Sequence, residues 1–149
     1  MNKLNNYIIL IVTIAWLSAC SVNNSRYSHK QDSAPEYHYG ELELVDATPR
    51  FELYAPANFR PYTVLGKYYT PMRTAKGFEE YGQASWYGQK FHGHLTSNGE
   101  IYDMFSMTAA HKTLPLPSFV KITNLDNQRG TIVRVNDRGP FHPGRFGLL

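Results

Sequence analysis

The stretch SFVKITNLDNQRGTIVRVND, from Ser118 to Asp137, carries the strongest signal for secondary structure in this chain. Its first and last runs, residues 118–125 and 131–137, alternate apolar and polar side chains, which is the pattern of half-buried strands. The intervening DNQRG is polar and ends in glycine, which favours a turn. The sequence therefore predicts a β-hairpin with a five-residue loop.

An aspartate, Asp137, ends the second predicted strand and is followed by arginine, glycine and proline. Because side chains alternate along a strand, Val133, Val135 and Asp137 are predicted to share one face. The two valines would place the carboxyl group at the edge of an apolar layer, where it could act as a proton donor. The turn at residues 139–140 would fix the backbone behind it. The alternative is that Asp137 caps a turn while Arg138 forms a surface ion pair.

Two further residues are candidates for a catalytic site. His111 follows two alanines in MTAAHKTLP, whose small side chains leave room beside the imidazole. The prolines just beyond it exclude regular strand or helix at 115–117. Glu100 follows Asn98 and Gly99, which form a strong turn signal. A structural interpretation stays open for each: a hydrogen-bonded histidine, and an ordinary surface glutamate.

The aromatic residues after position 81 could form a surface that stacks on a sugar ring, or they could be half-buried core residues. They are Trp86, Tyr87, Phe91 and Tyr102. No metal or other cofactor is expected, because His92 and His94 lack evident further ligands and the sequence has no phosphate-loop or nucleophile-elbow motif. A net charge of +3 without a basic stripe gives no indication of nucleic-acid binding.

The N-terminus has the features of a lipoprotein signal peptide over residues 1–19. Its apolar core, Ile8 to Leu17, is too short to span a membrane, and LSAC then places small residues before Cys20. We expect a lipid anchor on Cys20. Because Ser21 rather than an aspartate follows, we expect sorting to the outer membrane, with the chain facing the periplasm. Cys20 is the only cysteine, which excludes an internal disulfide; the alternative is an unmodified thiol.

Three regions follow the signal peptide. Residues 20–60 are polar, with scattered acids and prolines, and are predicted to be a flexible tether. The alternative is that ELELV and RFELYA within it are short strands of a larger fold. Residues 61–80 form a lead-in with the β-branched and aromatic content of extended structure. Residues 81–149 are predicted to be all-β, because no amphipathic helix of convincing length is present.

The segment from Pro61 to about Arg145 resembles the rare lipoprotein A family. The matching blocks are ASWYG, FHG, TSNGEIY, TAAHKTLPLPS, the TNL of the hairpin and VNDRGPF. This resemblance implies a double-psi β-barrel, a mainly β fold shared in outline with expansins and some lytic transglycosylases. The family's functional positions that match this sequence are Glu100, His111 and Asp137.

The resemblance also implies an activity, that of an endolytic peptidoglycan lytic transglycosylase. Such an enzyme cleaves the bond between N-acetylmuramic acid and N-acetylglucosamine in glycan strands poor in stem peptides and leaves 1,6-anhydro ends. It would act at the division septum, with septal division proteins as possible partners. Asp137 would be the general acid and then the general base, while His111 and Glu100 orient the substrate or tune the acid. The expected sugar contacts are Trp86, Tyr87, Phe91 and Arg138.

The end of the sequence departs from the family pattern, which continues beyond RFGLL. Residues 146–149 are therefore expected to be a truncated or frameshifted end. An incomplete barrel would have unpaired strand edges, which favour aggregation. Two alternatives to the enzyme follow: a non-catalytic peptidoglycan-binding septal lipoprotein, and an inactive truncated fragment.

Overall fold

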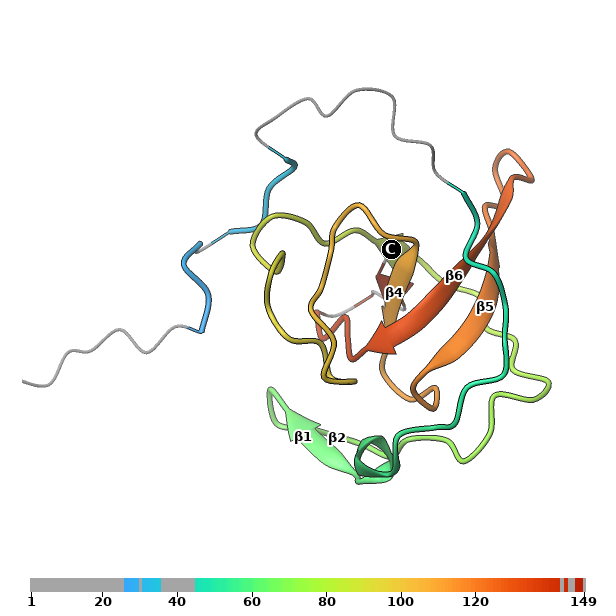
Figure 1. Ribbon diagram of the computed structural model, residues 1–149, viewed down its shortest axis with the longest axis horizontal. Helices are drawn as coiled ribbons and strands as arrows, with labels where there is room; N and C mark the ends of the chain where they lie inside the picture. The colour runs from blue at the N-terminus through green and yellow to red at the C-terminus, as the bar shows by residue number, and fades with distance from the viewer. Residues whose placement is uncertain (1–25, 30, 36–44, 143, 145–146, 149) are drawn as a thin grey trace, which may run out of the picture.

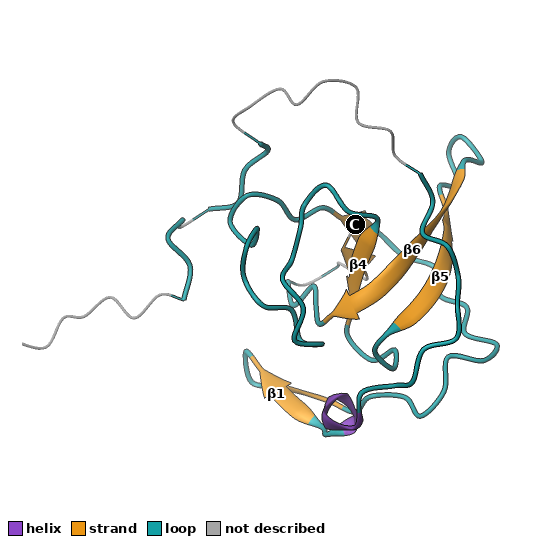
Figure 2. Cartoon of the chain, in the orientation of Figure 1, coloured by secondary structure: helices purple, strands orange, loops and turns teal. Residues whose placement is uncertain are grey.

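The computed structural model describes residues 26–29, 31–35, 45–142, 144 and 147–148. These residues form an all-β structure, as predicted, with one short 3-10 helix, η1 (Pro56–Phe59) (Figure 1; Figure 2). Within these residues, no helix has the length and apolar character needed to cross a membrane. The predicted signal peptide and Cys20 lie outside the described residues.

The described strands form two sheets. β1 (Tyr62–Val64) and β2 (Lys67–Tyr69) make a separate antiparallel hairpin within the predicted lead-in. The larger sheet contains five strands in the order β3-β7-β4-β6-β5. Their bounds are Ala84–Ser85 for β3, Thr108–His111 for β4, Ser118–Thr123 for β5, Gly130–Asp137 for β6 and Gly147–Leu148 for β7.

The predicted hairpin of the larger sheet is confirmed as β5 and β6. The two strands pair antiparallel from Ser118 opposite Val135 to Thr123 opposite Gly130. The loop covers residues 124–129, so it begins earlier than predicted. A hydrogen bond from the Asn124 amide to the carbonyl of Arg129 (2.8 Å) closes the loop and ends the ladder there.

β4 and β6 are parallel neighbours, and their pairing is irregular just before Asp137. Ala109 lies opposite Val135, but the next pair is Ala110 with Asp137, so Asn136 is an extra residue on β6. Strict alternation therefore ends at Val135, and Asn136 is buried next, at 3% exposure, while Asp137 is partly exposed. The bulge therefore interrupts the predicted alternation just before Asp137.

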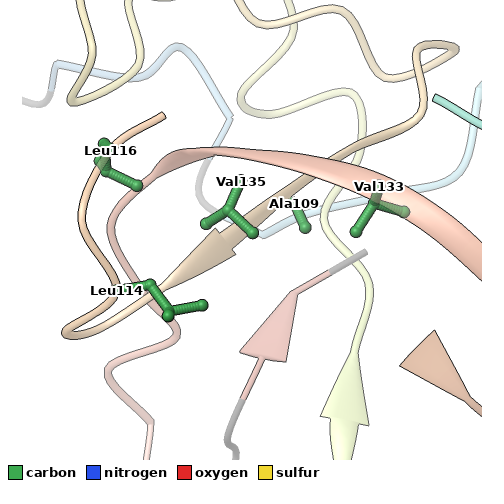
Figure 3. Packing of buried hydrophobic residues seen from close by; sticks show 5 residues of the cluster. All are labelled: Ala109, Leu114, Leu116, Val133 and Val135. Atoms are coloured by element: carbon green, nitrogen blue, oxygen red, sulfur yellow. The ribbon is translucent and has the colours of Figure 1, made fainter. Parts of the chain in front are cut away.

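The core lies between β4, β6 and the segment that follows β4 (Figure 3). Its buried members are Ala109, Leu114, Leu116, Val133 and Val135. The predicted proline-rich segment is irregular, as expected, and residues 114–117 are all buried. Fully burying each branched aliphatic side chain contributes about 1.5–3 kcal/mol, so this small cluster stabilises the junction at which β4 and β6 end.

Residues 46–60, which we call the strap, lie against the sheet and differ from the prediction of a flexible tether. The strap passes β6 and β5 on its way to η1 (Figure 1). The Asp46 carboxylate accepts hydrogen bonds from the Thr131 hydroxyl (2.6 Å) and the Ile132 amide (3.1 Å). The Ala47 amide donates to the Ile132 carbonyl at 2.9 Å. Its polar composition is misleading, because the strap is held by hydrogen bonds rather than by apolar burial.

The core predicts a stability difference between two leucines. Leu114 is 1% exposed, whereas Leu53 in the strap is 81% exposed. We expect Leu114→Ala to lower the free energy of unfolding by about 2–5 kcal/mol, because it leaves a cavity. Leu53→Ala, the matched control, should change it by less than about 0.5 kcal/mol. Urea unfolding followed by circular dichroism measures both; equal effects would show that Leu114 is not part of the core.

Candidate active site

The carboxylate of Asp137 stands at the end of β6 and is held through one of its oxygens. Oδ1 accepts hydrogen bonds from the Ser97 amide, the Ser97 hydroxyl and the Arg138 amide, each at 2.7 Å. From the described residues, Oδ2 accepts none. These three hydrogen bonds therefore fix the orientation of the carboxylate.

Ser97, which donates two of these hydrogen bonds to Asp137, lies in a tight turn formed by residues 96–100. The Gly99 amide donates to the Thr96 carbonyl (3.0 Å), and the Thr96 amide donates to the Glu100 carbonyl (2.7 Å). Gly99 has a φ of 83°, which favours glycine, and this confirms the predicted turn. The Asn98 amide donates to the Asn136 carbonyl at 3.1 Å, which ties the turn to β6.

Glu100 is the centre of a hydrogen-bonded cluster rather than a free surface residue. Arg134 donates twice to its carboxylate, at 2.6 and 2.9 Å, in a bidentate pair. The Asn136 side-chain amide donates at 2.9 Å and that of Asn98 at 2.6 Å. Burial disfavours the charged form, but the hydrogen bonds from Arg134, Asn136 and Asn98 outweigh it and lower the pKa of Glu100 to about 2. Glu100 is therefore a fixed anion and not a proton donor.

Arg134 binds a second carboxylate on its other side. Its Nε and Nη2 donate to Glu52 of the strap at 3.0 and 2.6 Å. We call Glu52, Asn98, Glu100, Arg134 and Asn136 the glutamate cluster. Sequence reasoning missed Arg134 and Asn136 as site residues. The available signal was their spacing, two residues apart on β6 and interleaved with the core valines.

His111, at the end of β4, is held in one tautomer. Its Nδ1 accepts from the amides of Leu114 (3.0 Å) and Thr113 (3.2 Å), so this nitrogen carries no proton. The proton is on Nε2, which donates to Glu80 at 2.8 Å. Burial lowers the pKa of His111 despite the opposing effect of Glu80. His111 is therefore neutral, with both nitrogens engaged, and it orients Glu80, a residue that sequence reasoning missed.

The strands bring the backbones of His111 and Asp137 together, because Ala110 pairs with Asp137 in the parallel ladder. Arg138 connects the same elements. Its guanidinium donates to the carbonyls of His111 (3.2 Å) and Leu114, and to that of Asn58 in η1 (2.9 Å). Burial lowers the pKa of Arg138. Its role in the structure is to join β4, the following segment and η1 through their carbonyls.

The aromatic residues divide into core and surface members. Tyr87 is 6% exposed and stacks on Tyr102 with ring centroids 4.1 Å apart, so its ring has no face to offer a sugar. Trp86 is 59% exposed. Phe91 is partly buried and contacts the rings of Tyr87 (5.7 Å) and Tyr27 (5.0 Å) edge-on. Of the predicted stacking residues, Trp86 is the most accessible.

Two surface cavities of about 330 and 370 Å³ lie beside the strap. The first is lined by strap residues together with Phe105, Phe119 and Arg134, and the second by the ends of β5 and β6. Asp137 lines neither of them.

The Glu100 interactions predict an acid-dependent loss of stability. Glu100 has a folded pKa of about 2 against an ordinary value of 4.5, so its interactions stabilise the fold above pH 4.5 and are lost as the pH falls through 2. The difference in unfolding free energy between wild type and Glu100→Gln should therefore shrink from about pH 5 to pH 2, measured by urea unfolding. Asp126→Asn, in the exposed loop after β5, controls for losing one carboxylate. A pH-independent difference for Glu100→Gln would contradict the assignment.

The sequence of the chain is similar to those of known proteins. A family model described as lytic transglycolase matches residues 79–146, and this confirms the predicted double-psi β-barrel. The chain is 52% identical over 146 residues to the endolytic peptidoglycan transglycosylase RlpA of Vibrio cholerae, covering 98% of this chain and 54% of that protein. It is 54% identical over 115 residues to the RlpA of Pseudomonas aeruginosa strain UCBPP-PA14, covering 77% and 33%.

A third relative is the endolytic peptidoglycan transglycosylase RlpA of Neisseria meningitidis strain MC58, 57% identical over 110 residues, or 73% of this chain and 46% of that protein. The chain thus spans about half, or less, of the length of these curated relatives. Within that span the identity is high and the blocks that carry the resemblance are present. The chain belongs to the rare lipoprotein A family.

Proposed function

We propose that this chain is an endolytic peptidoglycan lytic transglycosylase in which Asp137 is the catalytic acid and base. The observation that carries the proposal is the state of its carboxylate: Oδ1 holds three donors at 2.7 Å, while Oδ2 takes none from the described residues. The names of the relatives support the reaction class. The substrate class is glycan strands of peptidoglycan, preferentially those poor in stem peptides.

The proposed reaction needs one carboxyl group. Asp137 protonates the oxygen that joins N-acetylmuramic acid to N-acetylglucosamine, and the bond to the anomeric carbon breaks. The C6 hydroxyl of the muramic residue attacks that carbon and gives its proton to Asp137. The product is a 1,6-anhydro sugar, and no water is consumed. Most glycosidases use two carboxylates, but an intramolecular nucleophile removes the need for the second.

The surrounding residues have positioning roles in this scheme. Ser97 fixes the Asp137 carboxylate with two hydrogen bonds, and catalysis falls steeply when a reacting group is misplaced. Glu100 stays ionised, so it cannot supply the proton; it holds the 96–100 turn against β6 and thereby places Ser97. His111 orients Glu80 and anchors the segment after β4.

Substrate contact and location complete the proposal. The exposed indole of Trp86 is the proposed stacking surface for a sugar ring. Phe91 packs edge-on against Tyr87, and Arg138 orders the backbone at the end of β4. A lipid on Cys20 would anchor the chain in the outer membrane facing the periplasm, as the LSAC sequence indicates. Septal wall remodelling is the proposed setting, with septal division proteins as partners.

A second candidate function is peptidoglycan binding without cleavage. It is favoured by the exposed indole of Trp86, which can stack on a sugar ring whether or not Asp137 cleaves the strand. Under this alternative the chain retains affinity for sacculi and releases no product. Cleavage and binding can therefore be separated by assaying both on the same protein.

The Asp137→Asn variant tests the enzymatic proposal. Asparagine keeps the shape and an oxygen that can accept from Ser97, but it cannot donate an acidic proton. We expect release of anhydro-ended fragments from peptide-free glycan to fall by about 100- to 10,000-fold, measured by mass spectrometry. Binding to intact sacculi should persist, and the surface control Asp126→Asn should cleave normally. If Asp137→Asn cleaves like wild type, Asp137 is not the acid; if wild type binds without cleaving, the second function holds.

A further inference from the structure

The strap contributes a carboxylate to the candidate site from outside the region that matches the family model, residues 79–146. Glu52 binds one side of the Arg134 guanidinium at 2.6 and 3.0 Å, and Glu100 binds the other at 2.6 and 2.9 Å. The side chain of Arg134 is only 15% exposed. A guanidinium bound on two sides cannot rotate away from either carboxylate, so Glu52 determines the direction from which Arg134 meets Glu100.

A second connection runs from the strap to the same carboxylate. Asn58 of η1 donates its side-chain amide to Oδ1 of Asn98 at 2.9 Å. Because that oxygen is engaged, the amide nitrogen of Asn98 faces Glu100 and donates to it at 2.6 Å. Glu52 and Asn58 thus reach Glu100 through different residues, Arg134 and Asn98, and both start from the strap.

Glu52 lies between two cations, because its carboxylate also pairs with Arg50 at 3.0 Å. Without Glu52, the Arg134 guanidinium would keep only the Glu100 carboxylate as a charged partner and could turn about that one pair. Glu100 also determines where the 96–100 turn lies, and that turn supplies both hydrogen bonds from Ser97 to Asp137.

We propose that Glu52 and Asn58 are positioning residues for this site, acting on Glu100 through Arg134 and Asn98. The strap is then part of the site rather than a tether that precedes it. The effect on turnover rests on the proposed function, whereas the effect on Glu100 does not. The control residue for this proposal also lies in the strap: Asp46 accepts hydrogen bonds from Thr131 and Ile132 of β6 and has no hydrogen bond to a member of the glutamate cluster.

The first test measures turnover of the full chain on peptide-free glycan. Glu52→Gln and Asn58→Ala should each lower kcat by about 10- to 100-fold with KM changed by less than about threefold, because the reacting group is misplaced while sugar contacts remain. Asp46→Asn should loosen the strap, seen as a lower urea midpoint, and leave kcat unchanged. If all three variants lose kcat in proportion to stability, the strap is only structural and the proposal is overturned.

Coupling to Glu100 separates a specific effect from a general one. If Glu52 acts through Glu100, adding Glu52→Gln to Glu100→Gln should change kcat by less than about twofold. If the two losses multiply, Glu52 acts independently of Glu100 and the proposed connection is wrong. Glu52→Asp, which keeps the charge one methylene shorter, should restore more activity than Glu52→Gln.

A second test does not depend on catalysis. The side-chain carboxyl of Glu100 is titrated by NMR in wild type and in Asn58→Ala. Loss of Asn58 frees Asn98, weakens its hydrogen bond to Glu100 and should raise the midpoint of the titration. An unchanged midpoint overturns the positioning role of Asn58. If wild type releases no product but the midpoint rises, the enzymatic function fails and the positioning role stands.

Discussion

The guanidinium of Arg134 joins three parts of the chain that are far apart in sequence. It projects from β6, binds Glu52 of the strap and binds Glu100 of the 96–100 turn. Each carboxylate compensates the partly buried charge, and removing either would leave part of it unpaired, which is costly in a low-dielectric setting. The 96–100 turn then supplies both hydrogen bonds from Ser97 to Asp137. The geometry of the proposed catalytic acid therefore depends on a residue three positions earlier on the same strand.

β6 organises the molecule because successive residues serve different purposes. Ile132 bonds the strap, Val133 and Val135 fill the core, and Arg134 holds the glutamate cluster. The bulge at Asn136 changes this alternation just before Asp137. As a result the strand buries an amide that binds Glu100 and still presents a partly exposed carboxylate at its end. Bulges commonly re-aim a side chain beside a functional site, and this one separates the core from the chemistry.

The parts predicted correctly from sequence are those governed by local patterns. The hairpin of β5 and β6 follows from alternation, and the turn at Gly99 follows from the need for a positive φ. The polar composition of the strap predicts a tether, because composition does not reveal hydrogen bonds to a strand that lies 85 residues later, such as the one between Thr131 and Asp46. The pairing of Arg134 with two glutamates was missed for the same reason, since long-range partners leave no local signal.

Arg134 ties the 96–100 turn to the strand that ends in Asp137. Native-state hydrogen exchange on Arg134→Gln tests it most directly. In this variant the amides of Ser97 and Asn98 should lose protection by about tenfold or more, while amides in the ladder of β5 and β6 keep theirs. Unchanged protection at Ser97 and Asn98 would contradict it, because the turn would then hold its place against β6 without the guanidinium.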